Sequence, residues 1–178
     1  GIPLLDLKGL LPEEEIQSLI ERIVSRGGMV KNLHGQKNLY YQVNATYYSA
    51  LGESDEKMLL ARAIQMFMPG KPQIWYLDLF AGKNDHEAVQ RAGESGHKEI
   101  NRTNLSTDQI TEGLKKDVVQ KQLALIRMRN THKAFSEGAE VAISGGERSL
   151  EIRWKYNSAF ATLYVNFESG TYTIVESR

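Results

Sequence analysis

The sequence predicts an α/β fold followed by a small antiparallel β domain. Two patterns lead to this prediction. Over residues 1–134, apolar side chains recur mostly at helical spacing, and one short run has the composition of a buried strand. Over residues 135–178, apolar and polar side chains alternate, as they do in strands that cover one face of a core. We therefore predict two domains, 1–134 and 135–178.

Length, charge and composition exclude several classes of function. The chain has 178 residues and a mass of 20.1 kDa, which is enough for a substantial hydrophobic core. Its 22 basic and 22 acidic side chains cancel, so it lacks the field that draws proteins to nucleic acid. The absence of cysteine excludes disulfides, thiolate metal sites and a cysteine nucleophile. No apolar run approaches the roughly 20 residues of a membrane span. The sequence begins Gly-Ile-Pro, without an initiator Met or a positively charged leader, so there is no targeting segment to read. We expect a cytoplasmic protein without nucleic-acid or membrane partners.

The first predicted helix begins at Pro12 and ends before Gly27. Proline suits the first turn of a helix, and the three glutamates at 13–15 complement the helix dipole there. Five apolar side chains then recur at helical spacing: Ile16, Leu19, Ile20, Ile23 and Val24. Residues 31–41 show little periodicity, so we interpret them as a long loop that leads into a compact polar and aromatic segment at 42–48.

A second helix and a strand are predicted to form an α/β unit. Ser54 or Asp55 can cap the helix, its nearly continuous apolar surface indicates burial, and Pro69–Gly70 ends it. Residues 73–77, Gln-Ile-Trp-Tyr-Leu, are apolar on both faces, which is typical of a strand in a covered parallel sheet. The long polar segment 81–107 follows the carboxyl end of this strand, where parallel α/β sheets bind their ligands. We interpret that segment as functional or mobile.

A third helix is predicted over residues 117–131, and four antiparallel strands follow it. Apolar side chains alternate around 141–143, 150–156, 163–167 and 172–174, and turn residues separate these runs. One buried strand with two or three helices cannot cover its own apolar faces, because a parallel strand needs neighbours on both edges. We therefore expect the chain to be the end of a larger protein.

Several motifs resemble those of sucrose phosphorylases, in the same order and at similar spacing. The run Tyr-Gln-Val-Asn-Ala-Thr-Tyr-Tyr-Ser-Ala-Leu-Gly at 41–52 is similar to the segment after the seventh strand in that family. The other motifs lie at 60–65, 69–76, 81–85, 100–102 and 127–130, so the resemblance covers nearly the whole chain. Even Gly1-Ile2 is similar to the residues that follow a Thr-His-Asp motif there.

This resemblance implies a fold and an activity. The family belongs to the α-amylase superfamily, glycoside hydrolase family thirteen, whose members fold as a (β/α)8 TIM barrel with a small C-terminal β domain. They transfer an α-glucosyl unit to phosphate with retention, giving glucose 1-phosphate, by means of an Asp nucleophile, a Glu acid/base and a third Asp. All three carboxylates would precede Gly1, so we expect no catalytic residue here and no activity from the chain alone. The implied partners are a glucoside, inorganic phosphate and the missing N-terminal part of the barrel, and no cofactor is implied.

Three residues match substrate-binding positions of the family. Arg102 matches an arginine that binds the glucosyl unit, for which its fixed fork of donors is suited. Gln42 matches a glutamine of the same pocket, and Tyr41 matches a tyrosine whose hydroxyl alternately meets phosphate and the acceptor sugar. Without the resemblance, the three would be interpreted as solvated or packing residues.

One position departs from the sucrose-specific members. Leu39 stands where those members have an Asp that contacts the fructosyl unit, and leucine cannot accept hydrogen bonds from hydroxyl groups. Another acceptor, such as a phosphorylated sugar, glycerol or glycerate, is therefore credible. His34 and Lys37 on the same loop could supply positive charge to an anionic acceptor, or could be ordinary solvated side chains.

Two further groups of residues have the composition of possible sites. Residues 84–87, Asn-Asp-His-Glu, superficially resemble a metal cluster, but consecutive side chains cannot all enter one coordination sphere, so we expect no metal. We expect Asp85 to pin its loop instead. Trp154, Tyr156 and Tyr164 could form a sugar platform, but we favour core or cross-strand packing for aromatic side chains at this spacing.

Two alternative functions stay open on the sequence. The chain could be a standalone carbohydrate-binding or interaction module that packs against a partner. The parent enzyme could also act as a glycoside hydrolase or a transglucosidase, which Leu39 does not exclude.

Overall fold

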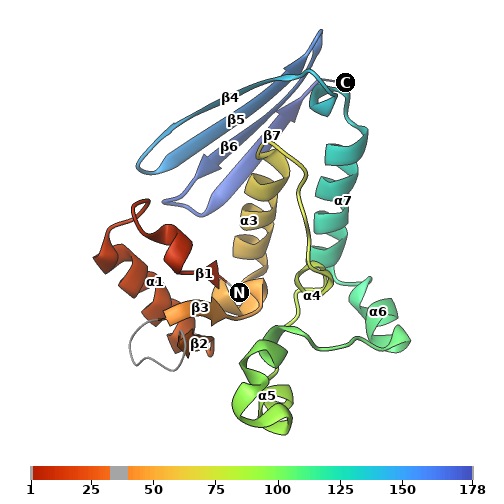
Figure 1. Cartoon of the computed structure of the whole chain (residues 1–178). Coiled ribbons are helices and arrows are strands. Elements are labelled where there is room, and N and C mark those ends of the chain that lie inside the picture. Colours follow the sequence, from red (N-terminus) through yellow and green to blue (C-terminus); the bar gives the residue numbers. More distant parts are fainter. Residues whose placement is uncertain (1, 33–39, 178) are drawn as a thin grey trace. The chain divides into compact units, whose positions relative to one another are not determined.

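The computed structural model describes residues 2–32 and 40–177, which form two compact units (Figure 1). The first unit is built from residues 1–54 and 75–112, and the second from residues 55–74 and 113–178. Each unit therefore combines two separate stretches of chain. The second unit contains residues on both sides of the predicted boundary at Phe135.

The first unit contains a small antiparallel sheet covered by one helix. The sheet has the order β1 (Ile2–Pro3), β3 (Tyr40–Asn44), β2 (Met29–Asn32), and η1 (Leu5–Leu7) follows its first strand. The predicted first helix is confirmed as α1 (Glu13–Ser25), with three carboxylates in its first turn. The buried face of α1 packs against Leu4, which precedes η1, and against Val43 of β3. The α1 residues of this cluster are Ile16, Ile20 and Ile23.

The strands β2 and β3 fall in the stretch that the sequence predicts to be a loop and a polar segment. Both are short, and Val30 and Val43 are paired across them. Val43 is buried in the cluster with α1, whereas its neighbours Gln42 and Asn44 are polar. One apolar pair does not generate a visible period of two, which explains why these strands were missed.

The predicted parallel strand at 73–77 is wrong. Residues 71–75 have no regular structure, and α4 (Tyr76–Leu79) is a single helical turn. A strand needs partners for its backbone N–H and C=O groups. Within residues 2–32 and 40–177 both sheets are antiparallel and neither includes residues 73–77.

The rest of the first unit is mainly helical. The predicted long polar segment 81–107 contains α5 (His86–Ala92) and η3 (Gly93–Asn101), while α2 (Tyr47–Ala50) precedes it and most of α6 (Thr107–Gly113) follows it. None of the α5 residues is buried, so this helix lacks the apolar stripe that would reveal it in the sequence. Ile100 at the end of η3 is fully buried and anchors the segment.

The second unit contains two long helices and the predicted β domain. The second and third predicted helices are confirmed as α3 (Asp55–Phe67) and α7 (Asp117–Thr131), which run side by side in Figure 1. The short η4 (Lys133–Phe135) leads into the sheet. The four antiparallel strands are also confirmed, in the order β4 (Glu140–Gly146), β5 (Ser149–Tyr156), β6 (Ala159–Asn166), β7 (Thr171–Glu176).

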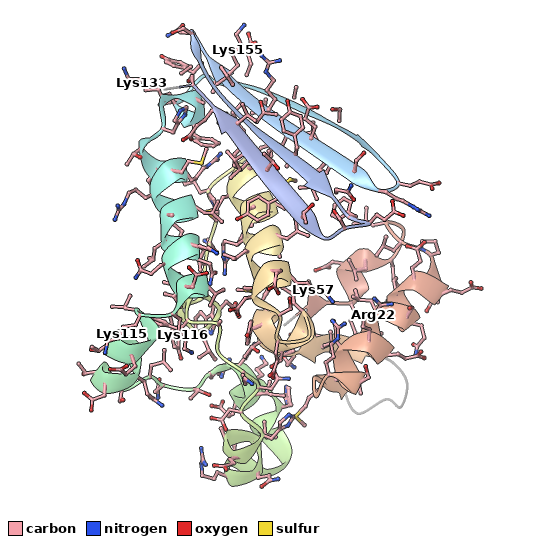
Figure 2. All side chains as sticks on the ribbon, turned by 180° about the vertical axis from the view of Figure 1, so that it is seen from behind. Arg22, Lys57, Lys115, Lys116, Lys133 and Lys155 are labelled. Atoms are coloured by element: carbon pink, nitrogen blue, oxygen red, sulfur yellow. The ribbon has the colours of Figure 1, made fainter. Side chains whose placement is uncertain are left out.

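The core of the second unit lies between the helices and one face of the sheet. From α3 it includes Ala63, Met66 and Phe67, from α7 Leu125, and from β5 and β6 Ile152, Trp154, Ala161, Leu163 and Val165. Lys155 occupies the other face of β5, on the side of the sheet away from α3 and α7 (Figure 2). No described helix combines the length and the apolar character needed to cross a bilayer.

The aromatic side chains of the sheet do not form one platform. Trp154 is buried in the core, as favoured from the sequence, and it is paired with Ala161. Tyr164 is paired with Glu151, three residues from Trp154, and is therefore on the opposite face with 45% of its surface exposed. Tyr156 shares the face of Trp154 but lies at the end of its strand.

Candidate functional site

The exposed Arg102 lies at the end of η3, between two residues that are held by other segments. Its own backbone N–H donates to the carbonyl oxygen of Glu99, at 3.1 Å. The indole Nε1–H of Trp75 donates to the carbonyl oxygen of Asn101, at 3.0 Å. The hydroxyl of Tyr76 donates to the carbonyl oxygen of Thr103, at 2.7 Å. The aromatic side chains of Trp75 and Tyr76, from the segment that was predicted to be a strand, thus support the residues on either side of Arg102.

Asp85 fixes the same loop from the start of α5. Its Oδ1 accepts the N–H of Ala88 at 2.8 Å and caps the helix, while its Oδ2 accepts the hydroxyl of Thr103 at 2.8 Å. Its own N–H donates to the carbonyl oxygen of Ile100, at 2.9 Å. The hydrogen bonds from Ala88 and then Thr103 hold the pKa of the Asp85 carboxyl below its ordinary value of 3.8. The expectation that Asp85 pins its loop is confirmed.

The turn before Asp85 is shaped by close packing. Ala81 has a φ of 50°, and a Cβ at Gly82 would overlap the side chain of the buried Leu77, which would have to shift. Asn84 then connects three segments. Its Oδ1 accepts the N–H of Thr46 at 2.8 Å, its Nδ2 donates to the carbonyl of Arg26 at 3.3 Å, and its N–H donates to the hydroxyl of Ser49 at 3.0 Å.

Gln42 belongs to the same assembly through the end of β3. Its Nε2 donates to Oδ1 of Asn44, at 2.8 Å, and both side chains occupy the face of β3 opposite to the buried Val43. Asn44 is 2% exposed, and its Nδ2 has no hydrogen-bond partner among the described residues. The Nδ2 of Asn101 donates to the carbonyl of Ala45, at 3.3 Å, and ties the residue before Arg102 to the strand that carries Gln42.

Arg102 itself is only loosely held. Its Nη1 is 3.4 Å from Oε1 of Glu99, and half of its side-chain surface is exposed. A guanidinium has five N–H donors, so this single long contact leaves donors for oxygen atoms of a ligand. The arrangement is therefore a hydrogen-bonded backbone that presents an exposed cationic side chain.

Two of the predicted site residues, Arg102 and Gln42, lie on segments that the hydrogen bond from Asn101 to Ala45 joins. Tyr41 lies in β3 next to Gln42, and its side chain is outside the described part of the chain. The acceptor-loop residues His34, Lys37 and Leu39 also lie outside the described residues. The supporting side chains were missed: Trp75, Tyr76, Asn84, Asn101 and Thr103. Their partners are distant in sequence, so no local pattern marks them.

The side chains of this candidate site offer hydrogen-bond donors and acceptors. Asp78 accepts the N–H of Tyr47 at 2.9 Å, Asp85 accepts from Ala88 and Thr103, and Glu99 makes the long contact to Arg102. The contacts of Asp85 hold the loop that carries Arg102. Among the described residues, no three or more His, Cys, Asp or Glu side chains are grouped so that they could hold a metal ion.

The lowered pKa of Asp85 predicts a loss of stability in acid. Because the folded pKa lies below the unfolded value of 3.8, Asp85 stabilises the fold fully above that pH, and the contribution is lost as the pH falls through the folded pKa. Asp85→Asn removes this titration, so the variant is less stable at pH 7 but loses less stability between pH 7 and pH 3, about the range in which carboxyl groups titrate. Urea midpoints across this range measure the difference. The control Asp108→Asn removes an exposed carboxylate of the same unit, and equal slopes for the two variants would contradict the prediction.

Comparisons with known proteins identify the family. The sucrose 6(F)-phosphate phosphorylase of Ilumatobacter coccineus is 52% identical over 183 residues, which cover 98% of this chain and 35% of that protein. The glucosylglycerol phosphorylase of Marinobacter adhaerens is 35% identical over 99% of this chain and 38% of its own length. The crystal structure of sucrose 6F-phosphate phosphorylase from Thermoanaerobacter thermosaccharolyticum matches with a TM-score of 0.88 and 36% identity, over 97% of this chain and 36% of that one.

The match is nearly complete for this chain and partial for its relatives. The chain spans about a third of the length of the curated relatives it matches. No family model matches it. The motifs at 41–52, 81–85 and 100–102, from which the resemblance was predicted, fall within the aligned region of the relative that is 52% identical over 98% of the chain. The chain therefore belongs to the sucrose phosphorylase-like members of glycoside hydrolase family thirteen, of which it represents the C-terminal portion.

Proposed function

We propose that the whole protein is a retaining glucosyl phosphorylase, which transfers an α-glucosyl unit from a glucoside to inorganic phosphate and releases glucose 1-phosphate. The observation that carries the proposal is the 52% identity to a sucrose 6(F)-phosphate phosphorylase over nearly the whole chain. In this proposal residues 1–134 complete a (β/α)8 barrel in the cytoplasm, and residues 135–178 are its β domain. The N-terminal part of the barrel supplies the Asp nucleophile and the Glu acid/base.

Arg102 and Gln42 then bind the glucosyl unit. The guanidinium of Arg102 donates to sugar hydroxyl oxygens, and its exposure together with its single long ion pair supports this role. The Nε2 of Gln42 is engaged by Asn44, which leaves Oε1 of Gln42 to accept from a hydroxyl. Tyr41 contacts phosphate and the acceptor sugar in turn.

The acceptor in this proposal is a phosphorylated fructose. Where sucrose-specific members have an Asp that contacts fructose, this chain has Leu39. The carboxylate of such an Asp would repel a phosphate group, and leucine does not. Lys37 and His34 on the same loop supply positive charge for that phosphate. The similarity to the sucrose 6(F)-phosphate phosphorylase of Ilumatobacter coccineus supports this acceptor.

Two proteins test the proposed function. The first is the 178-residue chain alone, which should release no glucose 1-phosphate from sucrose 6F-phosphate and phosphate. The second is a chimera in which the chain replaces the aligned 35% of the Ilumatobacter coccineus enzyme, which should restore the reaction. Turnover by the purified chain alone would contradict the assignment of the reacting carboxylates to the N-terminal part. A folded chimera without activity would contradict the phosphorylase assignment.

The identity of residue 39 predicts acceptor preference. In the chimera or the whole protein, Leu39→Asp should raise kcat/KM for sucrose relative to sucrose 6F-phosphate by about tenfold, because one added hydrogen bond to a charged acceptor and one added repulsion toward phosphate act together. Initial rates of glucose 1-phosphate release with each substrate give the ratio. Leu39→Asn is the matched control, since it adds an acceptor without the charge and should move the ratio less. An unchanged ratio in the Asp variant would exclude residue 39 from acceptor selection.

A further inference from the structure

We infer that Asp85 and Thr103 are positioning residues for Arg102, holding the backbone on which its guanidinium meets the glucosyl unit. The inference rests on the proposed function, and it goes beyond it because neither residue is expected to touch substrate. It is carried by the way the chain restrains the two neighbours of Arg102 while leaving Arg102 itself exposed.

Both neighbours of Arg102 are held twice. Asn101 accepts from the indole of Trp75 at its carbonyl and donates through Nδ2 to Ala45. Thr103 accepts from the hydroxyl of Tyr76 at its carbonyl and donates through Oγ1 to Asp85. In these four hydrogen bonds the two bonded residues are 18 to 56 positions apart in the sequence. The loop therefore cannot shift without breaking contacts to several segments.

The carboxylate of Asp85 divides its two oxygens between the helix and the loop. Oδ1 caps α5 through Ala88, and Oδ2 holds Thr103, both at 2.8 Å. A hydrogen bond to an ionised carboxylate is stronger than one between neutral groups, so the position of Thr103 is coupled to the start of a helix. Loops carry function when a rigid scaffold positions them, and this contact supplies that rigidity on the C-terminal side of Arg102.

The Asn101 contact relates this loop to the other proposed glucosyl ligand. Ala45 directly follows the end of β3, the strand that carries Gln42. The hydrogen bonds of Asn101 and Thr103 therefore fix the position of the Arg102 backbone relative to the strand that carries Gln42. Misplacing a binding group by about 1 Å can lower a reaction rate by about 100-fold, which is the scale of effect that such restraints prevent.

The test uses Thr103 variants of the whole protein. Thr103→Val keeps the shape and removes the hydroxyl, so kcat/KM for glucoside phosphorolysis should fall by about 10- to 100-fold. Thr103→Ser keeps a hydroxyl and should stay within about twofold of the unmodified protein. Tyr76→Phe, which removes only the second bond to Thr103, should lower kcat/KM in the same direction. It also keeps the inference testable if Thr103→Val does not fold.

The effect of Thr103→Val on kcat/KM in an Arg102→Ala variant distinguishes a positioning role of Thr103 from a merely structural one. If Thr103 acts through Arg102, Thr103→Val should lower kcat/KM by less than about twofold once the guanidinium is absent, because coupled groups are not additive. The inference is overturned if valine and serine at 103 give equal kcat/KM, or if the valine effect is undiminished in the Arg102→Ala background. In either case an active unmodified protein leaves the proposed function standing. An unmodified protein that is folded but forms no glucose 1-phosphate overturns both.

Discussion

Replacing Arg102 with alanine will lower kcat/KM for glucoside phosphorolysis by about 100-fold or more. Hydrogen bonds from a charged group contribute about 1.5–3 kcal/mol each, and each 1.4 kcal/mol of lost transition-state binding is tenfold in rate. The effect follows from an arginine whose neighbours are fixed while its own side chain, half exposed, makes one long ion pair. Little stability should be lost, because exposed ion pairs contribute little.

Steady-state release of glucose 1-phosphate measures this effect, and two variants sharpen it. Arg102→Lys keeps the charge but loses the planar fork, so it should recover only part of the activity. Arg91→Ala removes another exposed arginine of the same unit, which makes a comparable ion pair to Glu87 at 3.6 Å, and it should leave kcat/KM within about twofold. Equal losses for Arg91→Ala and Arg102→Ala would exclude a specific role for Arg102.

The elements that could be predicted from the sequence are those whose own period reports their burial. In α1, Ile16, Ile20 and Ile23 form one buried stripe, and in β5 Ile152 and Trp154 alternate with exposed residues. The strand predicted at 73–77 failed because a short apolar run does not distinguish a strand from a turn whose aromatic side chains support another loop. The side chain of Trp75 is a hydrogen-bond donor to Asn101 and is half exposed.

The candidate site divides in the same way. The loop-pinning role of Asp85 is confirmed by its bonds to Ala88 and Thr103, whereas the binding roles of Arg102 and Gln42 stay predictions from motifs. The bonds from Tyr76 and Asp85 to Thr103 span 27 and 18 residues, and such pairings depend on the tertiary fold. Local patterns therefore locate the residues that would bind substrate, whereas the residues that position them emerge only from the structure.

The largest expected loss of stability follows from replacing Trp154 with alanine. Its side chain is 7% exposed, its ring centroid is 5.4 Å from that of Phe135, and the guanidinium of Arg129 lies 4.3 Å from its ring centre. Its Nε1–H donates at 2.6 Å to the carbonyl of Phe67, the last residue of α3, where a helix has no backbone donor of its own. Removing a buried tryptophan costs about 3–5 kcal/mol. This variant also leaves the carbonyl of Phe67 without its donor and removes one of the two rings on which Arg129 stacks, the other being Phe135.

Two matched variants separate these contributions. Trp154→Phe keeps a ring for Arg129 but loses the N–H, so its cost should be about 1–3 kcal/mol, the penalty of an unpaired buried carbonyl. Tyr164→Ala truncates an aromatic side chain of similar size on the opposite face of the same sheet, 45% exposed, and should cost about 1 kcal/mol or less. Urea unfolding followed by far-ultraviolet circular dichroism orders the three variants. If Trp154→Ala and Tyr164→Ala were equally destabilising, Trp154 would not be the link between α3 and the sheet, and the core of the second unit would have to be stabilised mainly by its aliphatic side chains.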